Sequence, residues 1–558
     1  MHDNLGAAAP SASGGNRISS YFYDLFMDRR PGGRVLWVMP SPRSRPARLL
    51  AGADALVNRL YGSSLNPLYQ SGTIAVLLLL VLLATGLWLV FFYRIGAPWD
   101  SVAEITGDRW IGSWVRGVHR YASDAAMVAT LVHAVRITLQ RRTWGPRALA
   151  WITGLALFGM VLLCGVTGFV LVWDAFGRAL AVESARVLDA LPILSEPVSR
   201  AFTGERPVPG TFFFLTLFVH LALPLGMGLA LWLHVSRIAR PTLLPPRRLA
   251  WGVTGLLLAA ALLLPLGMEP AGDAFRLPER LTTDWLYAWS LPLTRLSPPG
   301  PVWLLGAMLA GMFLLVPRWT RPRPVERPPS HVDEALCVGC RQCAWDCPYE
   351  AIAMVPRDDG RAEIVARVDP ERCVSCGICA GSCAPMGVGP PGRTGRDQLE
   401  RVRGFLADPA RRPGEVVAIA CEHGAMALAD LIQREGAVPY PVDCAGNLHT
   451  SVVELLVRGG AGGVLVLPCH PRDCRNREGP RWLQGRMFEG REAELQERVD
   501  RRRVLVASAG AAEPGAVTAG LRALAASVRE LDQPRTEARP EPETVCEPAP
   551  PLRRRAAR

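Results

Sequence analysis

The stretch WVRGVHRYASDAAMVATLVHAVR, residues 114–136, is largely apolar and yet carries two histidines, His119 and His133. An imidazole is costly in hydrocarbon, so a membrane helix that keeps two of them is expected to use them. The two histidines are 14 residues apart, which is close to four helical turns. Both rings therefore lie on one side of the helix, roughly 21 Å apart along its axis. The stretch predicts a membrane span that presents two imidazoles on one face.

A second apolar stretch repeats this spacing. LFVHLALPLGMGLALWLHVSR, residues 217–237, contains His220 and His234, again 14 residues apart. If the two spans run in the same direction, His119 pairs with His220. In the same register, His133 pairs with His234. Neutral imidazole is an axial ligand of haem iron, so the two pairs predict two bis-histidine haems b. The alternative, that each histidine only forms hydrogen bonds within the membrane, is disfavoured by the matched spacing.

Glycines in two further apolar spans share the same period. The spans at 71–93 and 148–173 each contain two glycines that are 14 residues apart: Gly72, Gly86, Gly154 and Gly168. Because glycine has no Cβ, it lets a helix backbone approach a flat ligand closely. Taken singly, these glycines are equally typical of helix–helix packing. Together with the histidine register, they predict clearance for the two haems.

Six apolar runs suggest a helical membrane domain: 71–93, 111–138, 148–173, 211–238, 250–268 and 302–317. The first four exceed the roughly 20 residues that cross about 30 Å of hydrocarbon. The fifth run is about the minimum length and the sixth is short, so the alternative for these two is a soluble helical core. The sequence therefore predicts an all-α transmembrane haem-binding bundle of about six spans.

Arginines set the expected orientation of this bundle. They gather after the second, fourth and sixth runs: Arg136, Arg141, Arg142, Arg147, Arg237, Arg240, Arg247, Arg248, Arg318, Arg321, Arg323 and Arg327. With six spans these places share one side, which the positive-inside rule assigns to the cytoplasm. The net charge of +12 is explained in this way, and no nucleic-acid binding is expected. The first 16 residues lack an apolar segment, so no secretory signal is expected.

Most of the cysteines lie in the C-terminal half, where two runs of the form CxxCxxCxxxC occur. CVGCRQCAWDCP begins at Cys337 and CVSCGICAGSCA begins at Cys373. This spacing is typical of a bacterial-type ferredoxin with two [4Fe–4S] clusters, in which the fourth cysteine of each run ligates the other cluster. The predicted ligand sets are Cys337, Cys340, Cys343 and Cys383 for one cluster, and Cys373, Cys376, Cys379 and Cys347 for the other. Zinc is the alternative for CxxC pairs.

Residues 412–530 carry short apolar runs that predict the buried strands of an α/β unit. Four more cysteines lie in this unit: Cys421, Cys444, Cys469 and Cys474. Four thiolates suit a further iron–sulfur cluster or a zinc ion, and a buried set of metal-free thiols is the remaining alternative. Clustered cysteines that do not form a disulfide framework also indicate a reducing compartment for this half of the chain.

Residues of about 65–317 resemble the cytochrome b family of quinol-oxidising bc complexes. The likeness rests on TGLWLVFFY, APWDSVAEI and TGFVLVWD, together with Pro224 four residues after His220. The resemblance implies a low-potential haem near the outer face, held by His119 and His220, and a second haem near the cytoplasmic face. It also implies that Arg116 pairs with a haem propionate.

The segment RLTTDWLYAWSLPLTRL, residues 280–296, is similar to the Pro-Glu-Trp-Tyr quinol-site segment of that family. The four positions here read Thr283, Asp284, Trp285 and Leu286. A carboxylate at this place can accept a quinol proton, so Asp284 is the predicted acceptor. The alternative is an ordinary interfacial aspartate beside an aromatic-belt tryptophan. The proline and the tyrosine of the family segment are replaced here by Thr283 and Leu286.

The α/β unit resembles the delta subunit of methyl-viologen-reducing hydrogenase through CEHGAMALADL, DCAGNLH and GGVLVLPCHPRDC. That resemblance implies a [2Fe–2S] cluster and electron transfer between a hydrogenase and a heterodisulfide-reductase-type flavoprotein. Some family members carry an additional cysteine where this chain has Gly424.

These inferences predict six regions: an N-terminal tail and surface helix (1–65), a four-helix haem domain (66–240), two further membrane helices (241–320), a small α+β ferredoxin domain (331–392), an α/β cluster-binding domain (412–530) and a disordered tail (531–558). The expected setting is a prokaryotic cytoplasmic membrane, with the C-terminal domains in the cytoplasm. A homodimer is an expectation from the resemblance.

The predicted function is electron transfer between a cytoplasmic hydrogenase-like or heterodisulfide-reductase-like enzyme, the iron–sulfur clusters, the two haems and the quinone pool. Two alternatives stay open. Quinol oxidised at the outer face could drive electrons to a low-potential cytoplasmic acceptor, or the chain could act as a redox sensor without turnover.

Overall fold

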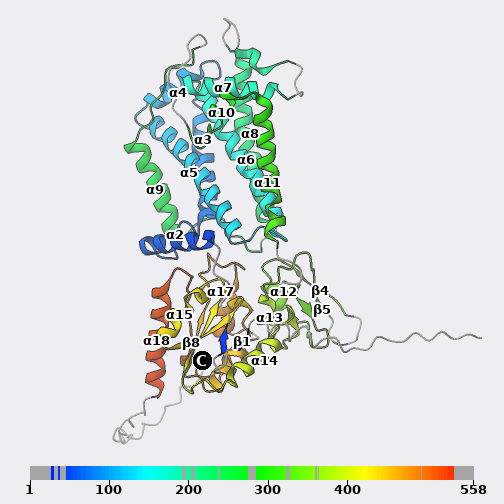
Figure 1. Cartoon of the computed structure of the whole chain (residues 1–558). Coiled ribbons are helices and arrows are strands. Elements are labelled where there is room, and N and C mark those ends of the chain that lie inside the picture. The colour runs from blue at the N-terminus through cyan, green and yellow to red at the C-terminus, as the bar shows by residue number, and fades with distance from the viewer. Residues whose placement is uncertain are drawn as a thin grey trace, which may run out of the picture.

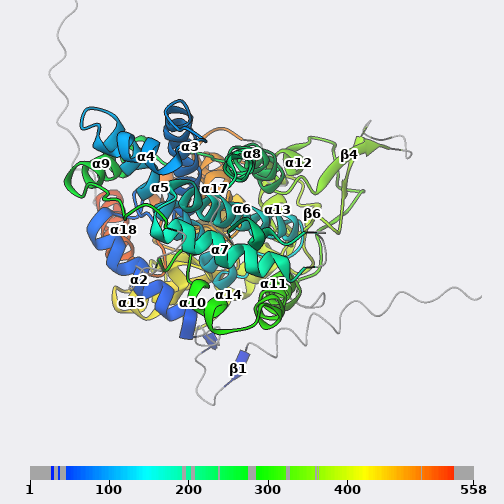
Figure 2. The ribbon, with the colours of Figure 1, turned by 90° about the horizontal axis from the view of Figure 1, so that it is seen from above.

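The computed structural model describes residues 27–29, 35–37, 45–191, 196–202, 208–236, 239–273, 284–321, 327–357, 361, 364–491 and 493–532. Helices gather at one end of the molecule, and the strands and short helices of the C-terminal half lie at the other end (Figure 1). Seen from above, the helical part lies over much of the C-terminal half, and β4 extends to one side of it (Figure 2). The structure confirms the predicted fold class of a helical bundle followed by a small ferredoxin domain and an α/β domain.

Six apolar helices form the bundle: α3 (Ser71–Val90), α5 (Gly112–Leu139), α6 (Arg147–Val172), α8 (Gly210–Val235), α9 (Arg247–Leu263) and α11 (Pro299–Thr320). Within the described residues, five of them are long and apolar enough to cross a membrane. The exception is α9, which has 17 residues and so falls short of the usual length of a span. Six is therefore an approximate number of spans.

The bundle is apolar on its outer surface, as lipid contact requires. Leu225 and Leu229 of α8 are 78% and 62% exposed, and Leu263 of α9 is 78% exposed. Inside the bundle, α3 packs on α5 and α6 packs on α8. The chain alternates in direction through α3, α5, α6 and α8, so α5 and α8 are parallel (Figure 1).

Short helices close both ends of the bundle. Away from the C-terminal half lie α4 (Pro98–Gly107), α7 (Ala175–Asp189), a 3₁₀ turn (Val198–Phe202) and α10 (Leu291–Leu296). On the opposite end, α2 (Arg45–Tyr61) lies across the ends of the long helices (Figure 1). Asp54 of α2 pairs with Arg136 of α5, whose Nη1 lies 2.7 Å from Asp54 Oδ1. Upstream of α2, β1 (Met27–Arg29) and β2 (Val35–Trp37) form an antiparallel pair.

The ferredoxin part consists of two small antiparallel sheets and two short helices. Its elements are β3 (His331–Val332), α12 (Gln342–Asp346), β4 (Ile352–Pro356), β5 (Ile364–Val368), α13 (Ile378–Ser382) and β6 (Val388–Gly389). β3 pairs with β6 and β4 pairs with β5. Many of the buried residues of this part are cysteines, because a domain of this size has few apolar side chains with which to build a core.

The α/β part is a parallel four-stranded sheet in the order β10–β9–β7–β8. The strands are β7 (Val416–Cys421), β8 (Ala437–Val442), β9 (Gly463–Leu467) and β10 (Val504–Val506). Helices cover both faces: α14 (Gly395–Leu406), α15 (Ala429–Arg434), α16 (Thr450–Arg458), α17 (Gly479–Phe488) and α18 (Pro514–Asp532). Alternate residues of each strand point to opposite faces. Val464 and Val466 accordingly join the core under α14, α16 and α17, whereas Leu465 joins the core under α15 and α18.

Candidate functional site: two imidazole pairs and three cysteine sites

The four histidines of α5 and α8 meet as the two predicted pairs. The ring centres of His119 and His220 are 6.5 Å apart, and so are those of His133 and His234. A metal–imidazole bond of about 2 Å on each side places two ring centres roughly 6 Å apart. Each pair therefore has the separation that one iron atom between the two rings requires. We call the pair His133–His234 the soluble-side haem site and the pair His119–His220 the far-side haem site.

The four predicted glycines each face one of these four rings. A Cβ built on Gly72 would lie 2.8 Å from His133 Cε1, and one on Gly154 would lie 3.1 Å from His234 Cε1. At the far-side haem site, the corresponding distances are 3.1 Å from Gly86 to His119 and 3.2 Å from Gly168 to His220. A side chain at any of these positions would press on an imidazole, so the glycines give the rings their room.

Three of the four imidazoles each form a hydrogen bond with a threonine hydroxyl group. The Oγ1 atoms of Thr85, Thr167 and Thr153 lie 2.9, 3.0 and 3.3 Å from the Nδ1 atoms of His119, His220 and His234. The same three hydroxyls donate to carbonyls of their own helices, at 2.8–2.9 Å. Because each hydroxyl hydrogen is used in this way, Nδ1 must be the donor to the hydroxyl oxygen. This leaves Nε2 as the free lone pair that a metal needs.

Sequence reasoning missed these hydroxyls, although a signal was present. Each glycine of the set follows a residue with a hydroxyl group: Ser71, Thr85, Thr153 and Thr167. Cys164 also contacts this set, with its Sγ 3.6 Å from Nδ1 of His220. The ring separation, the glycine clearance and the fixed tautomer all fit haem ligation, with iron between the paired imidazoles.

Arg116 lies one helical turn from His119 on α5. Its Nη1 donates to the carbonyl of Gly267 at 3.4 Å. A guanidinium has five donors, so this one bond leaves capacity for the propionate that the resemblance implies. Its predicted role stays a prediction.

Asp284 lies beside the far-side haem site and is held on both of its carboxylate oxygens. Oδ2 accepts from Nη2 of Arg120 at 2.8 Å, and Arg120 directly follows His119. Oδ1 accepts from the backbone amides of Leu286 at 3.0 Å and Tyr287 at 2.6 Å. Thr283 lies outside the described residues, and the Trp285 side chain is exposed. The predicted proton acceptor is thus already paired with a cation.

Tyr287 is a buried residue that sequence reasoning passed over. Its hydroxyl lies 2.7 Å from both the hydroxyl and the carbonyl oxygen of Ser123 on α5. Its ring fills the space beside Gly165 of α6, where no side chain would fit. Tyr287, one residue after Leu286, therefore joins the loop to the bundle.

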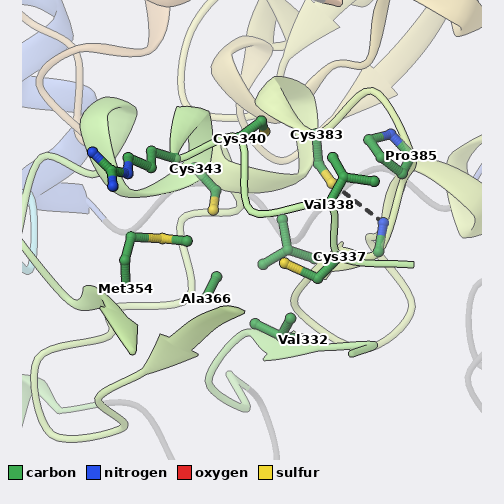
Figure 3. A pocket seen from close by; sticks show the side chains of 12 residues that line it. Val332, Cys337, Val338, Cys340, Cys343, Met354, Ala366, Cys383 and Pro385 are labelled. Atoms are coloured by element: carbon green, nitrogen blue, oxygen red, sulfur yellow. Dashed lines mark hydrogen bonds between the residues drawn. The ribbon is translucent and has the colours of Figure 1, made fainter. Parts of the chain in front are cut away.

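The first cysteine cavity collects Cys337, Cys340, Cys343 and Cys383 (Figure 3). Apolar residues, among them Val332, Met354 and Ala366, line the rest of it. The backbone amide of Gly387 donates to Cys383 Sγ at 3.3 Å, a contact that would stabilise a thiolate. Val338, which lies between two of the cysteines, is 60% exposed, so this cavity is near the surface.

The second cysteine cavity collects Cys347, Cys373, Cys376 and Cys379. The backbone amides of Ala351 and Ser330 donate to Cys347 Sγ and Cys373 Sγ, both at 3.3 Å. In each cavity, three cysteines come from one run and the fourth comes from the other run, as the sequence predicts for [4Fe–4S] ligands.

The third cysteine site lies at one edge of the parallel sheet. Cys421 ends β7, Cys444 follows β8 and Cys469 follows β9, and the carboxyl ends of parallel strands meet at one edge. The Sγ atoms of Cys421 and Cys469 are 3.3 Å apart. A Cβ on Gly479 would lie 3.0 Å from Cys444 Sγ and 3.5 Å from Cys474 Sγ. A Cβ on Gly424 would lie 3.0 Å from Cys469 Sγ, so position 424 borders the thiols.

Charged groups surround the third site. Burial alone would raise the pKa of Asp443, but its contact with His423 and the guanidinium groups of Arg327 and Arg393 outweigh burial and hold that pKa below its usual value. A hydrogen bond from the Cys474 thiol lowers the pKa of Cys444, against the effect of burial. An ionised Asp443 beside Cys444 adds negative charge, which the two arginines balance.

The cysteines of the first two sites suit clusters better than single ions. Zinc ligands converge on one point, with Zn–S distances of about 2.3 Å. The thiols of the first two sites instead line cavities, and none of the 13 described cysteines forms a disulfide.

Comparison with known proteins identifies three regions. Residues 56–241 match the family described as cytochrome b/b6/petB, residues 336–387 match the 4Fe-4S dicluster domain, and residues 416–532 match the delta subunit of methyl-viologen-reducing hydrogenase. A solved chain titled "Hyperthermophilic respiratory Complex III" aligns with 54% of this chain and 80% of that chain, at 18% identity. Its TM-score of 0.34 is too low to bear on the fold.

These matches confirm the three resemblances region by region. The cytochrome b region implies haem b, and the dicluster region implies [4Fe–4S] clusters. The five long apolar helices among the described residues agree with a multi-pass membrane protein. The chain is therefore a membrane electron-transfer protein in which a cytochrome b region is fused to a dicluster ferredoxin region and a hydrogenase delta-subunit-like region.

Proposed function

We propose that this protein passes electrons between a cytoplasmic redox enzyme and the quinone pool, through one [2Fe–2S] cluster, two [4Fe–4S] clusters and two haems b. The observation that carries the proposal is the pairing of four imidazoles at 6.5 Å, each with a glycine beside it. The ferredoxin and α/β parts, which carry the three cysteine sites, form the C-terminal, soluble half of the chain and lie beyond the ends of the same helices (Figure 1). Covalent fusion keeps the soluble centres near the haems at high effective concentration.

Two features of the C-terminal half support the proposed partner enzyme and the proposed cytoplasmic membrane. The match to the hydrogenase delta-subunit family supports a hydrogenase-like or heterodisulfide-reductase-like partner. Arginines at the ends of the long helices that face the soluble half, such as Arg141, Arg142 and Arg240, support a cytoplasmic location for that half in a prokaryotic cytoplasmic membrane.

When bound, the haems and clusters supply one-electron chemistry. The chain positions and tunes them. Paired imidazoles such as His133 and His234 would hold the haem irons, and threonine hydroxyls fix the tautomer of three of the four rings. The apolar linings of the cysteine cavities exclude water, which raises the effect of each nearby charge and hydrogen bond.

The second candidate reverses the flow, with quinol oxidised at the far face. Asp284 favours it, because this carboxylate lies beside the far-side haem site and contacts Arg120. Asp284→Asn tests it in the intact protein, with quinol-dependent haem reduction as the readout. A loss of that reduction supports far-face quinol chemistry. Unchanged rates assign Asp284 to holding the loop, through its bonds to Leu286 and Tyr287.

The main proposal is tested with purified protein in lipid, without oxygen. The iron–sulfur centres are reduced chemically, haem b absorption is followed, and a quinone analogue is then added. Haem reoxidation with formation of quinol is the expected result. Haems that stay reduced would exclude quinone as their acceptor. A His133→Leu variant, which lacks one ligand of the soluble-side haem site, is expected to reoxidise its remaining haem without drawing electrons from the clusters.

A further inference from the structure

The loop between Cys469 and Cys474 rests on the end of α5. Asp473, the residue before Cys474, accepts hydrogen bonds on Oδ1 from Arg136 Nη2 at 2.5 Å and from Gln140 Nε2 at 2.7 Å. Arg136 is 5% exposed, so its ion pair with Asp473 is shielded from solvent and from salt. The third cysteine site is thus fixed directly to the membrane domain.

The contact lies on the haem-ligand face of α5. Arg136 and Gln140 are three and seven residues after His133. At about 100° per residue, all three side chains share one face of the helix, and Gln140 lies roughly 10 Å along the axis from His133. Asp473 therefore attaches the loop before Cys474 to this face of α5, about two helical turns beyond His133.

Two further contacts hold the same loop. The ring centres of His470 and Tyr69 are 5.8 Å apart. Glu478, which follows the loop, pairs with Arg240 at 2.6 Å, and Arg240 comes shortly after α8, the helix that carries His234. The loop is thus attached near both helices that supply the soluble-side imidazoles.

The other side of the third site touches the second cavity. Arg393 donates to Asp443, next to Cys444, at 2.5 Å, and to the carbonyl of Ser375, next to Cys376, at 2.9 Å. Asn447 also donates to the carbonyl of Gly377 at 2.9 Å. Two polar bridges therefore connect the third site to the second cavity.

The third site is more deeply buried than the first cavity. The four thiol residues of the third site are only 2–5% exposed, whereas the first cavity includes the exposed Val338. The third site is covered by the membrane domain and by the ferredoxin part, and the first cavity is near the surface. A centre that is buried between two others suits a relay better than an outer terminal.

We propose that the third cysteine site is an internal relay between the second cavity and the soluble-side haem site, and that Asp473 is the positioning residue for the contact with the haem. This inference rests on the proposed function, and it differs from an order in which the third site receives electrons first from the partner. One electron leaves the reduced third centre and reduces one ferric haem, and no bond is made or broken.

The test mixes the intact, oxidised protein in lipid with less than one equivalent of dithionite and freezes samples at short times. Electron paramagnetic resonance reports the reduced third centre, and optical spectra report the haems. Asp473→Ala is expected to slow haem reduction about tenfold or more, because small misplacements cost large factors in rate. The reduced third centre should accumulate meanwhile. Asp473→Glu should restore most of the rate.

Arg393→Ala should give the complementary result, because Arg393 bridges the second cavity and the third site, and electrons are proposed to pass in that order. In this variant, the electron paramagnetic resonance signal of the reduced third centre should appear late, and the reduced centre should not accumulate. Arg502→Ala is the matched control, because its ion pair with Asp500 is exposed and lies before β10, at the sheet edge opposite the third site. A wild-type rate in Asp473→Ala, or a slow rate without accumulation of the third-centre signal, would overturn the relay. Wild-type haems that never take electrons from the clusters would instead refute the proposed function itself.

Discussion

Gly72 lies against the imidazole of His133, so closely that a Cβ on the glycine would come within 2.8 Å of the ring. The same relationship recurs at three other places in the bundle. Gly72→Val should therefore displace His133 and remove about half of the haem b, with the far-side haem retained. Haem content per polypeptide and the reduced-minus-oxidised spectrum measure this. Gly159→Val on α6 is the control, since nothing lies within 4 Å of its added Cβ. A full haem content in Gly72→Val would contradict the assignment.

Thr85→Val removes the hydroxyl that accepts from Nδ1 of His119. Loss of such a partner typically weakens metal binding about 10–100-fold, so the far-side haem should dissociate more readily and its midpoint potential should shift. Competition with a haem acceptor and a redox titration give the two values. Thr216→Val on α8 is matched in chemistry, because Thr216 bonds only to its own helix at Phe212. Equal haem retention in both variants would argue against the role of Thr85.

Cys340 and Cys383 come from different runs but line one cavity. If they ligate one cluster, Cys340→Ser and Cys383→Ser should each lose one [4Fe–4S] cluster, and the double variant should lose no more iron than either. Cys340→Ser with Cys376→Ser should lose both clusters. Iron analysis and electron paramagnetic resonance measure this. An additive loss in the first double variant would refute the crossed ligand sets.

Arg486 joins the ferredoxin part to the α/β part. It is 1% exposed, and it contacts Asp346 at 3.2 Å and the carbonyls of Gly446 and Ile378. Arg486→Ala leaves buried acceptors without a partner and should lower stability by about 3 kcal/mol or more. Denaturant titration followed by cluster absorbance measures this. Arg502→Ala, at an exposed ion pair, should leave the unfolding midpoint nearly unchanged. Similar midpoints for the two variants would contradict the structural role of Arg486.

Regular spacing in the sequence predicted much of the candidate site. The 14-residue spacing of His119 and His133 placed both rings on one face, and the cysteine runs predicted the grouping that now lines the two cavities. The hydroxyl partners were present in the sequence but unnoticed, because threonine in a helix is common and has many uses. The length of α9 was overestimated, since an apolar run does not reveal where the helix ends at Leu263.

Contacts between domains could not be read from the sequence. Asp473 and Arg136 are far apart in the chain, and nothing in either local pattern indicates their pairing. The order of the redox centres depends on such contacts. Similarly, α14 precedes residue 412 yet contributes Val402 and Phe405 to the core of the α/β part, because helix packing is decided by tertiary structure.

We propose that one chain carries electrons from its cysteine sites to its haems. The most direct measurement mixes the oxidised protein with a limiting reductant and follows cluster and haem absorbance in the same sample. We predict that the clusters are reduced first and are reoxidised as the haems are reduced. A variant with Cys340, Cys376 and Cys474 changed to serine should lose this fast phase. Haem reduction at the same rate in that variant would contradict the account.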